Sequence, residues 1–128
     1  MTFFQICGSR EYYIYSIVDL IIDFHRDSIP RKSTFIEVND KNYAKMMIVM
    51  GGLSNYFDIN YNDALEITKE SNQILKGIMK NILVREAYYN QDLSKNMVLI
   101  EVGSDENYYN EVLNSIDVLS QAIHEMLR

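Results

Sequence analysis

Two polar residues stand at or inside the most apolar stretches of this chain, and both are of types that bind metal ions or transfer protons. His25 follows the apolar run 17–24, and Glu101 lies inside the run 97–103. Burial of an unpaired carboxylate is unfavourable, so Glu101 is expected to face a cation, a metal ion or a proton. A histidine and a glutamate that converge at the edge of a sheet can bind zinc and activate water. The alternatives are an ion pair of Glu101 with a lysine or arginine, and an ordinary loop position for His25.

Strands and helices that alternate along the chain must position these two side chains. Three apolar runs predict buried strands: 17–24, 44–50 and 97–102. The alternation of polar and apolar residues in 34–38 predicts a half-exposed strand. Apolar residues at helical spacing predict one helix over 61–82 and another that follows Ser104. We therefore expect an α/β fold, a three-layer, mostly parallel sheet flanked by helices, with His25 and Glu101 near the carboxyl ends of strands, where sites form.

Length and composition set limits on the classes of protein to which this chain can belong. The 128 residues, 48% of them hydrophobic, predict a single domain over 1–128, of which 1–16 form an atypical N-terminal segment. The net charge of −6 argues against a nucleic-acid partner, which requires a basic surface. The single cysteine excludes an internal disulfide. We also expect neither an export signal nor a membrane span, because the most apolar run is short and contains Asp19 and Asp23.

Several blocks in the same order resemble the stage II sporulation protein P family. The blocks are His25-Arg26-Asp27, Tyr89-Asn90-Gln91, Leu93-Ser94 and Leu99-Ile100-Glu101-Val102-Gly103, with Asn107 beyond them. The family consists of bacterial peptidoglycan hydrolases related to zinc-dependent N-acetylmuramoyl-L-alanine amidases. The resemblance implies an amidase-like fold for 17–128, which would be the C-terminal region of such a domain, with the N-terminal part of the fold missing or shortened.

The resemblance also implies roles for individual residues. His25 is expected to bind a catalytic zinc ion, and Glu101 is expected to be the general acid/base that takes a proton from water and passes it to the leaving amine. The bond that is cut would be the amide between N-acetylmuramic acid and L-alanine. Four more residues could contact the substrate or support the site, although a purely structural role is equally compatible with their positions: Arg26, Asp27, Asn90 and Gln91.

The chain departs from the family where the other zinc ligands are expected. The family has an earlier motif close to His-Thr-His-Thr-Thr-Glu, and this sequence has nothing like it. The only other histidine, His124, is expected on the surface of the last helix. A catalytic zinc ion normally has three protein ligands. Cys7 and Glu11 could replace the missing ones, because thiolate and carboxylate both bind zinc, whereas the alternative for Cys7 is a small buried residue.

Two hypotheses of different class follow. In the first, the chain is a zinc amidase of peptidoglycan, or part of one, with an incomplete ligand set. In the second, it is a truncated, catalytically inactive domain that serves as a binding or interaction module. A small-ligand α/β domain is a weaker third, because Gly51-Gly52 alone is not a phosphate-binding loop.

The resemblance also implies where and with what the protein acts. The expected partners are peptidoglycan and septal wall-remodelling proteins, and an exposed sheet edge could pair with a second copy of the chain. Family members act outside the cytoplasmic membrane and are tethered to it, and the present sequence alone does not predict a location.

Overall fold

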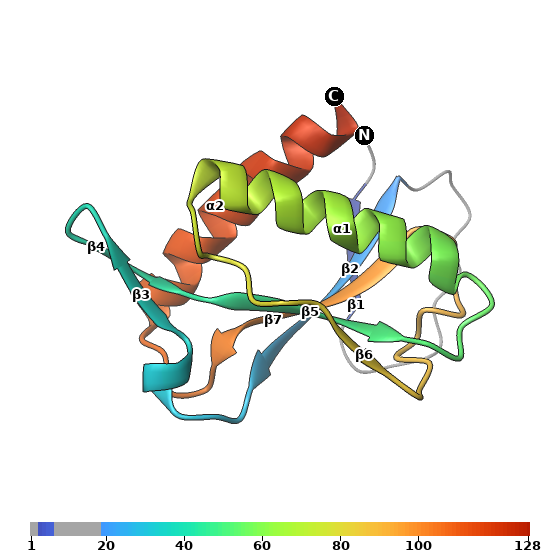
Figure 1. Cartoon of the computed structure of the whole chain (residues 1–128), viewed down its shortest axis with the longest axis horizontal. Helices are drawn as coiled ribbons and strands as arrows, with labels where there is room; N and C mark the ends of the chain where they lie inside the picture. The colour runs from blue at the N-terminus through green and yellow to red at the C-terminus, as the bar shows by residue number, and fades with distance from the viewer. Residues whose placement is uncertain (1–2, 7–18) are drawn as a thin grey trace.

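A computed structural model describes residues 3–6 and 19–128, which form a sheet, a separate hairpin and two helices (Figure 1). The elements in chain order are β1 (Phe3–Ile6), β2 (Leu20–Asp27), a 3₁₀ turn (Arg31–Ser33), β3 (Phe35–Val38), β4 (Lys41–Ala44), β5 (Met46–Gly51), α1 (Phe57–Ile74), β6 (Leu83–Arg85), β7 (Met97–Ser104) and α2 (Tyr109–Leu127). The predicted mixture of strands and helices is confirmed. The atypical segment 1–16 and the single-domain prediction remain largely untested, because most of that segment lies outside the described residues.

The main sheet has five strands in the order β1-β2-β7-β5-β6. Its pairs β1–β2, β2–β7 and β5–β6 are parallel, and β5–β7 is antiparallel. The strands β3 and β4 form the separate antiparallel hairpin. The prediction of a mostly parallel sheet is therefore confirmed, with one exception. Parallel strands are joined by a crossover connection, usually a helix. Between β2 and β5 the chain forms only the 3₁₀ turn and the β3–β4 hairpin, so β5 returns antiparallel to β7.

Both helices cover the same face of the main sheet (Figure 1). Side chains alternate along a strand, and Ile22 of β2, Ile48 of β5 and Ile100 of β7 are buried in one core with Ile67 of α1 and Leu119 of α2. The predicted three-layer arrangement differs from this: over residues 19–128, sheet and helices form two layers. The dense apolar strands suggested cover on both faces, but they owe part of their burial to the loop between β6 and β7.

The face of the sheet opposite to α1 and α2 is called the helix-free face below. It carries alternate residues of the central strands, namely Asp23, His25, Met47, Val49, Leu99 and Glu101. No helix of the described part of the chain packs on it (Figure 1). Of the polar members of this set, His25 is exposed and Glu101 is half-buried, whereas Asp23 is buried.

Several element boundaries differ from the prediction. Helix α1 begins at Phe57 rather than at residue 61, and the predicted strand 44–50 is divided between the end of β4 and β5. The strand β2 continues to Asp27, so His25 lies within it rather than after it. Helix α1 ends at Ile74, whereas the apolar spacing predicted a helix to residue 82. The helical path ends at Leu75, whose φ of −141° and ψ of 102° are extended. Gly77 then turns the chain with a φ of +87°, and the backbone oxygen of Ile78 accepts a hydrogen bond from the N–H of Met46. The apolar residues beyond the helix therefore belong to an extended segment. Neither α1 nor α2 is long and apolar enough to cross a membrane.

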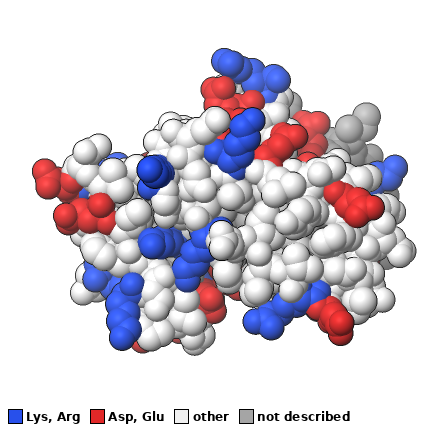
Figure 2. Space-filling view, viewed as in Figure 1, with Lys and Arg blue, Asp and Glu red and all other residues white. Residues whose placement is uncertain are grey.

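Acidic and basic side chains are interspersed on the face of the molecule seen in Figure 2, with a wide uncharged area between them. One acidic side chain on α1, Asp63, is half-buried. Its Oδ2 atom is buried and accepts no hydrogen bond from any residue of 19–128. Burial, and secondarily the charge of Glu66, raises the pKa of Asp63 to about 6.

Replacement of Asp63 by asparagine is expected to stabilise the protein at pH 7. The raised pKa means that the charged carboxylate is disfavoured in the folded state, so stability falls as the pH rises through about 6. Because solvent reaches and screens this side chain, we expect a gain of about 1 kcal/mol in the free energy of unfolding. Urea denaturation at pH 7 and pH 3.5 measures it, and the gain should vanish at the lower pH. An equal gain at both values, or the same pH-dependent gain in the exposed control Asp117→Asn, would contradict this explanation.

Candidate functional site

The structure brings His25 and Glu101 together on the helix-free face. They are register partners on the adjacent parallel strands β2 and β7. Partner residues on adjacent strands have their backbones about 4.8 Å apart and present their side chains on the same face. The electrostatic interaction between the two is strong enough to affect the pKa of Glu101. The apolar runs that predicted these strands thus also place the two polar residues side by side.

Asp23 is a third polar residue of this group. It lies two positions before His25 on β2, and its Oδ1 atom is 3.0 Å from Nε2 of His25. The Asp23 side chain is only 3% exposed. The two atoms are close but are not aligned as a hydrogen bond, and Oδ1 has no hydrogen-bond partner among the described residues. A buried carboxylate at this distance is positioned to orient the imidazole of His25.

The environment of Glu101 raises its pKa above the ordinary value for a glutamate. The largest cause is burial, followed by the negative charge of Asp27; Asp23 acts in the same direction, and His25 opposes them. The Oε2 atom of Glu101 is buried and receives no hydrogen bond from any described residue. A carboxyl group whose pKa is raised is a stronger base than an ordinary glutamate and keeps its proton to a higher pH, two properties that general acid/base catalysis uses.

A pocket of about 160 Å³ opens beside Glu101 on the helix-free face. We call it the open-face pocket. Its lining consists of Asp27, Met47, Val49, Leu83, Arg85, Tyr89, Leu99 and Glu101. These residues come from four strands and from the loop between β6 and β7. The sequence analysis missed Arg85 and Tyr89, although Tyr89 stands in one of the family-like blocks beside the two residues that were singled out.

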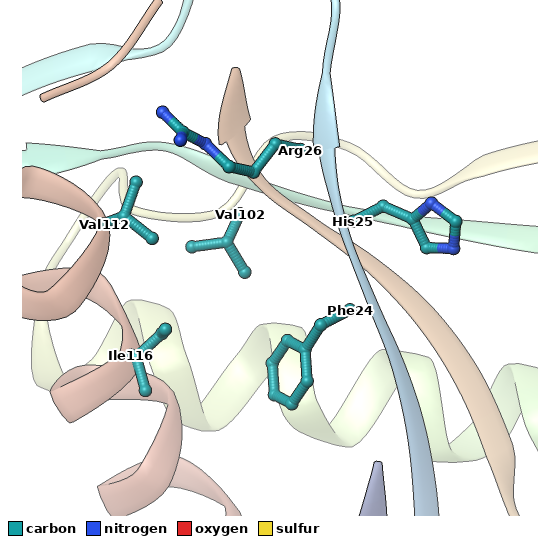
Figure 3. Close-up of a pocket in the computed structure, with 6 residues that line it drawn as sticks. All are labelled: Phe24, His25, Arg26, Val102, Val112 and Ile116. Carbon is teal, nitrogen blue, oxygen red and sulfur yellow. The ribbon is translucent and has the colours of Figure 1, made fainter. Parts of the chain in front are cut away.

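Arg26 lies on the other face of the sheet. Figure 3 shows the Arg26 and Phe24 side chains on one side of β2 and the His25 ring on the opposite side. A mainly apolar cavity of about 300 Å³ lies between β2 and α2, and its lining consists of Phe24, His25, Arg26, Val102, Val112 and Ile116. The ring of His25 nevertheless points away from the other five side chains (Figure 3). The guanidinium of Arg26 donates hydrogen bonds to the backbone oxygens at the end of β7 and just beyond it, those of Ser104 and Asn107. The arrangement therefore favours a structural role, in which Arg26 holds the ends of β2 and β7 together.

Gln91 is fully buried and holds the loop between β6 and β7 against the sheet. Its side-chain amide donates to the carbonyl of Val49 and accepts from the N–H of Gly51. Its backbone oxygen accepts a hydrogen bond from the side-chain amide of Asn60 on α1. Asn90, half-buried, adopts a left-handed φ of +62° before it. Gln91 thus supports the site through the backbone, and Asn90 contributes to the turn that brings Tyr89 to the pocket.

A buried hydrogen-bond network fixes the end of β7 at Ser104, three residues beyond Glu101. Oδ1 of Asn107 accepts 2.7 Å hydrogen bonds from the N–H of Ser104 and from the hydroxyl of Thr34. Its amide nitrogen donates to Glu111, whose carboxylate also pairs with Arg31. The hydrogen bond from Arg31 is the main cause that lowers the pKa of Glu111. This ion pair contributes stability at neutral pH that is lost as the pH falls through the range of an ordinary glutamate, about 4.3, and below.

The zinc ligands that the sequence suggested are only partly brought together. Within residues 19–128, no three histidine, cysteine or acidic side chains form a group that could hold a metal ion. Cys7 and Glu11, the suggested replacement ligands, lie outside the described residues. His124 is exposed and lines a different cavity near the end of α2. His25 with its neighbouring carboxylates is therefore a partial donor set, and the described residues alone do not fit a catalytic zinc ion.

Replacement of Asp27 by asparagine is expected to lower the pKa of Glu101 in the metal-free chain. Asp27 is the largest charged contributor to the raised value, and its removal relieves the repulsion between two carboxylates. A ¹³C NMR titration of the Glu101 carboxyl measures the shift. The matched control is Asp105→Asn, which removes an exposed carboxylate beyond the end of β7 and should leave the titration unchanged. An unchanged Glu101 titration in the Asp27 variant would show that burial alone sets the pKa.

Comparison with known proteins gives two matches. The family model described as stage II sporulation protein P matches residues 12–124. The stage II sporulation protein P of Bacillus subtilis (strain 168) is 31% identical to the chain over 111 residues. The aligned part covers 83% of this chain and 28% of the Bacillus protein, so the chain spans less than a third of that relative. No solved structure matches the chain.

Proposed function

Because the chain belongs to the stage II sporulation protein P family, we propose that it acts on bacterial peptidoglycan as part of a zinc-dependent amidase. The proposed reaction is hydrolysis of the amide bond between N-acetylmuramic acid and L-alanine. The name of the family associates the chain with sporulation. The observation that carries the proposal is the placement of His25 and Glu101 as register partners on the helix-free face, next to a pocket.

Glu101 is the proposed general acid/base. Its carboxylate takes a proton from the attacking water, and the same group then delivers the proton to the nitrogen of the leaving L-alanine amine. The raised pKa supports this role, because the protonated form persists to a higher pH than in an ordinary glutamate. Asp23 and Asp27 contribute to the reaction through their charges, which raise the pKa of Glu101 and so make its carboxylate a stronger base.

His25 is the proposed metal ligand, and Asp23 is positioned to orient its imidazole. A zinc ion bound here would polarise the amide carbonyl and lower the pKa of water. Since the described donors are too few, the proposal requires further ligands from elsewhere: Cys7 and Glu11, or residues of a longer protein. The amidase-like, three-layer fold belongs to the same proposal, with the third layer supplied by parts of the fold beyond residues 19–128.

The same proposal includes partners. Peptidoglycan is the substrate, and septal wall-remodelling proteins are the proposed associates. Strand β1 is an edge of the main sheet and covers only the first half of β2, up to Asp23. The second half of β2 is therefore a free strand edge among the described strands, at which a further strand or a second copy of the chain could pair.

The experiment that tests the function follows the amide bond itself. The 128-residue chain is incubated with a soluble muramoyl tripeptide and Zn²⁺, and new L-alanine amino termini are quantified by mass spectrometry. We expect release that depends on the metal and stops on addition of a chelator. The His25→Ala variant should lose both activity and bound zinc. Absence of new amino termini with the metal-loaded wild-type chain would overturn the proposal that Cys7 and Glu11 complete the zinc site and that this chain by itself hydrolyses the amide bond.

A further inference from the structure

We infer that Arg85 and Tyr89 determine which peptide the site accepts: the open-face pocket binds a substrate carboxylate at Arg85, and Tyr89 forms the wall beside it. This inference rests on the proposed function and adds a substrate feature to it, namely an acidic residue next to the amide bond that is cut. Three observations support it. The guanidinium of Arg85 has no partner among the described residues, the charges in the pocket are separated, and the loop between β6 and β7 is fixed against β5.

Arg85 is an exposed cation at the end of β6 that lines the pocket. Its side chain forms no hydrogen bond or ion pair with any residue that the structure describes, whereas Arg26 and Arg31 are both engaged. A guanidinium presents several N–H groups in a plane that matches a carboxylate. Arg85 is therefore the arginine of this region with the capacity to bind an incoming anion.

The charges in the open-face pocket are separated. Glu101 and Asp27 lie on β7 and β2, and Arg85 lies two strands away from β7, beyond β5. An acidic peptide is repelled at the Glu101 side and attracted at the Arg85 side. It therefore enters with its carboxylate at Arg85 and an uncharged part near Glu101. This orientation is the one that amide hydrolysis by Glu101 needs.

The register gives the length of the peptide that fits. On β5, Met47 is opposite Glu101 and Gly51 is opposite Arg85. Four residues along a strand and two strand spacings separate the two backbone positions by about 16 Å. Both side chains are long and line the same pocket, so the gap between their charged ends is that of a short peptide segment, at about 3.5 Å per residue. The acidic residue is therefore expected one or two residues from the reacting amide.

The loop that carries Tyr89 is held rigidly enough to act as a wall. A Cβ atom on Gly51 would lie 2.6 Å from the backbone oxygen of Tyr88, so the loop rests directly on β5. The buried side chain of Gln91 adds two hydrogen bonds to the same strand. Tyr89 itself has a φ of +49°, a backbone conformation that is maintained by these neighbouring contacts. The backbone that carries Tyr89 is thus held at the pocket that Arg85 also lines before a ligand arrives.

A binding experiment separates this inference from the proposed function. The probes are N-acetylmuramoyl-L-alanyl-D-glutamate and the same molecule with both glutamate carboxylates amidated. NMR titration of the metal-free wild-type chain is expected to show tighter binding of the acidic probe, by roughly tenfold, because a hydrogen-bonded charge pair contributes about 1.5 kcal/mol or more. Arg85→Gln should remove this preference, and Arg85→Lys should retain part of it. The control Lys76→Gln changes an exposed cation that does not line the pocket and should preserve it.

The possible results distinguish failure of the role of Arg85 from failure of the proposed function. Equal affinity of the wild-type chain for both probes, with shifts at Glu101, would overturn the role of Arg85 and leave the proposed function intact. A preference that persists unchanged in Arg85→Gln would have the same meaning. If neither probe binds, both the inference and the proposed function are wrong. A folded Arg85→Gln variant is expected, because the side chain is exposed.

Discussion

Replacement of Glu101 by glutamine is expected to reduce amide hydrolysis by roughly 10²–10⁴-fold, the range associated with loss of a general acid/base. Glutamine keeps the size of the side chain but can neither take a proton from water nor deliver one to the leaving amine. The rate of release of L-alanine amino termini measures the loss. The matched control is Glu86→Gln, an exposed glutamate next to Arg85 on the loop, and it should retain the wild-type rate.

The same variant is expected to be more stable than the wild type at neutral pH. The raised pKa of Glu101 means that its charged form is disfavoured in the folded state, so the wild type loses stability as the pH rises through the folded-state pKa. Glutamine carries no charge and avoids this loss. An inactive but more stable protein excludes unfolding as the cause of inactivity. A variant that keeps more than about a tenth of the wild-type rate would contradict the catalytic role.

Replacement of Gly103 by alanine is expected to lower the free energy of unfolding by about 3 kcal/mol, through backbone strain and overpacking together. Gly103 has a φ of +66°, a conformation that other residues rarely adopt. A Cβ atom there would also lie 2.6 Å from Cβ of Ala44 and would collide with the side-chain oxygen of Asn107. The end of β7 and its hydrogen-bond network would have to move. Chemical denaturation measures the change.

A second glycine provides the control for this prediction. A Cβ atom on Gly52 would have its nearest neighbours at 3.4 Å, and its φ lies outside the left-handed region. Gly52→Ala should therefore change the free energy of unfolding by less than about 0.5 kcal/mol. Similar losses in the two variants would indicate that the close contacts around Gly103 do not determine the effect.

The pattern of apolar residues was sufficient to predict much of the fold. The runs around Ile22 and Leu99 are strands because β-branched and long apolar side chains pack well on both sides of a central strand. The structure pairs these two strands as parallel neighbours, and the pairing brings His25 close to Glu101. The layers and the antiparallel pair β5–β7 could not be predicted. Local periodicity does not specify which face of a sheet a helix will cover, or which strands will be adjacent.

The candidate site was predicted in part. Glu101 was recognisable as a carboxylate inside an apolar strand. Asp23 carries the same signal and was overlooked, although its spacing of two from His25 places both side chains on one face of a strand. Arg85 and Tyr89 reach the pocket through tertiary contacts of the loop with β5, which no spacing in the sequence encodes. The side of β2 on which Arg26 lies follows from the same period of two, once the strand is known to continue beyond His25.

The central claim is that the reacting face is the helix-free face of the sheet, where His25 and Glu101 lie side by side. Chemical-shift mapping with N-acetylmuramoyl-L-alanyl-D-glutamate tests it most directly. We predict that the largest shifts occur at His25, Glu101 and Tyr89. Shifts concentrated instead at Val112 and Ile116, in the cavity on the α2 side, would contradict it.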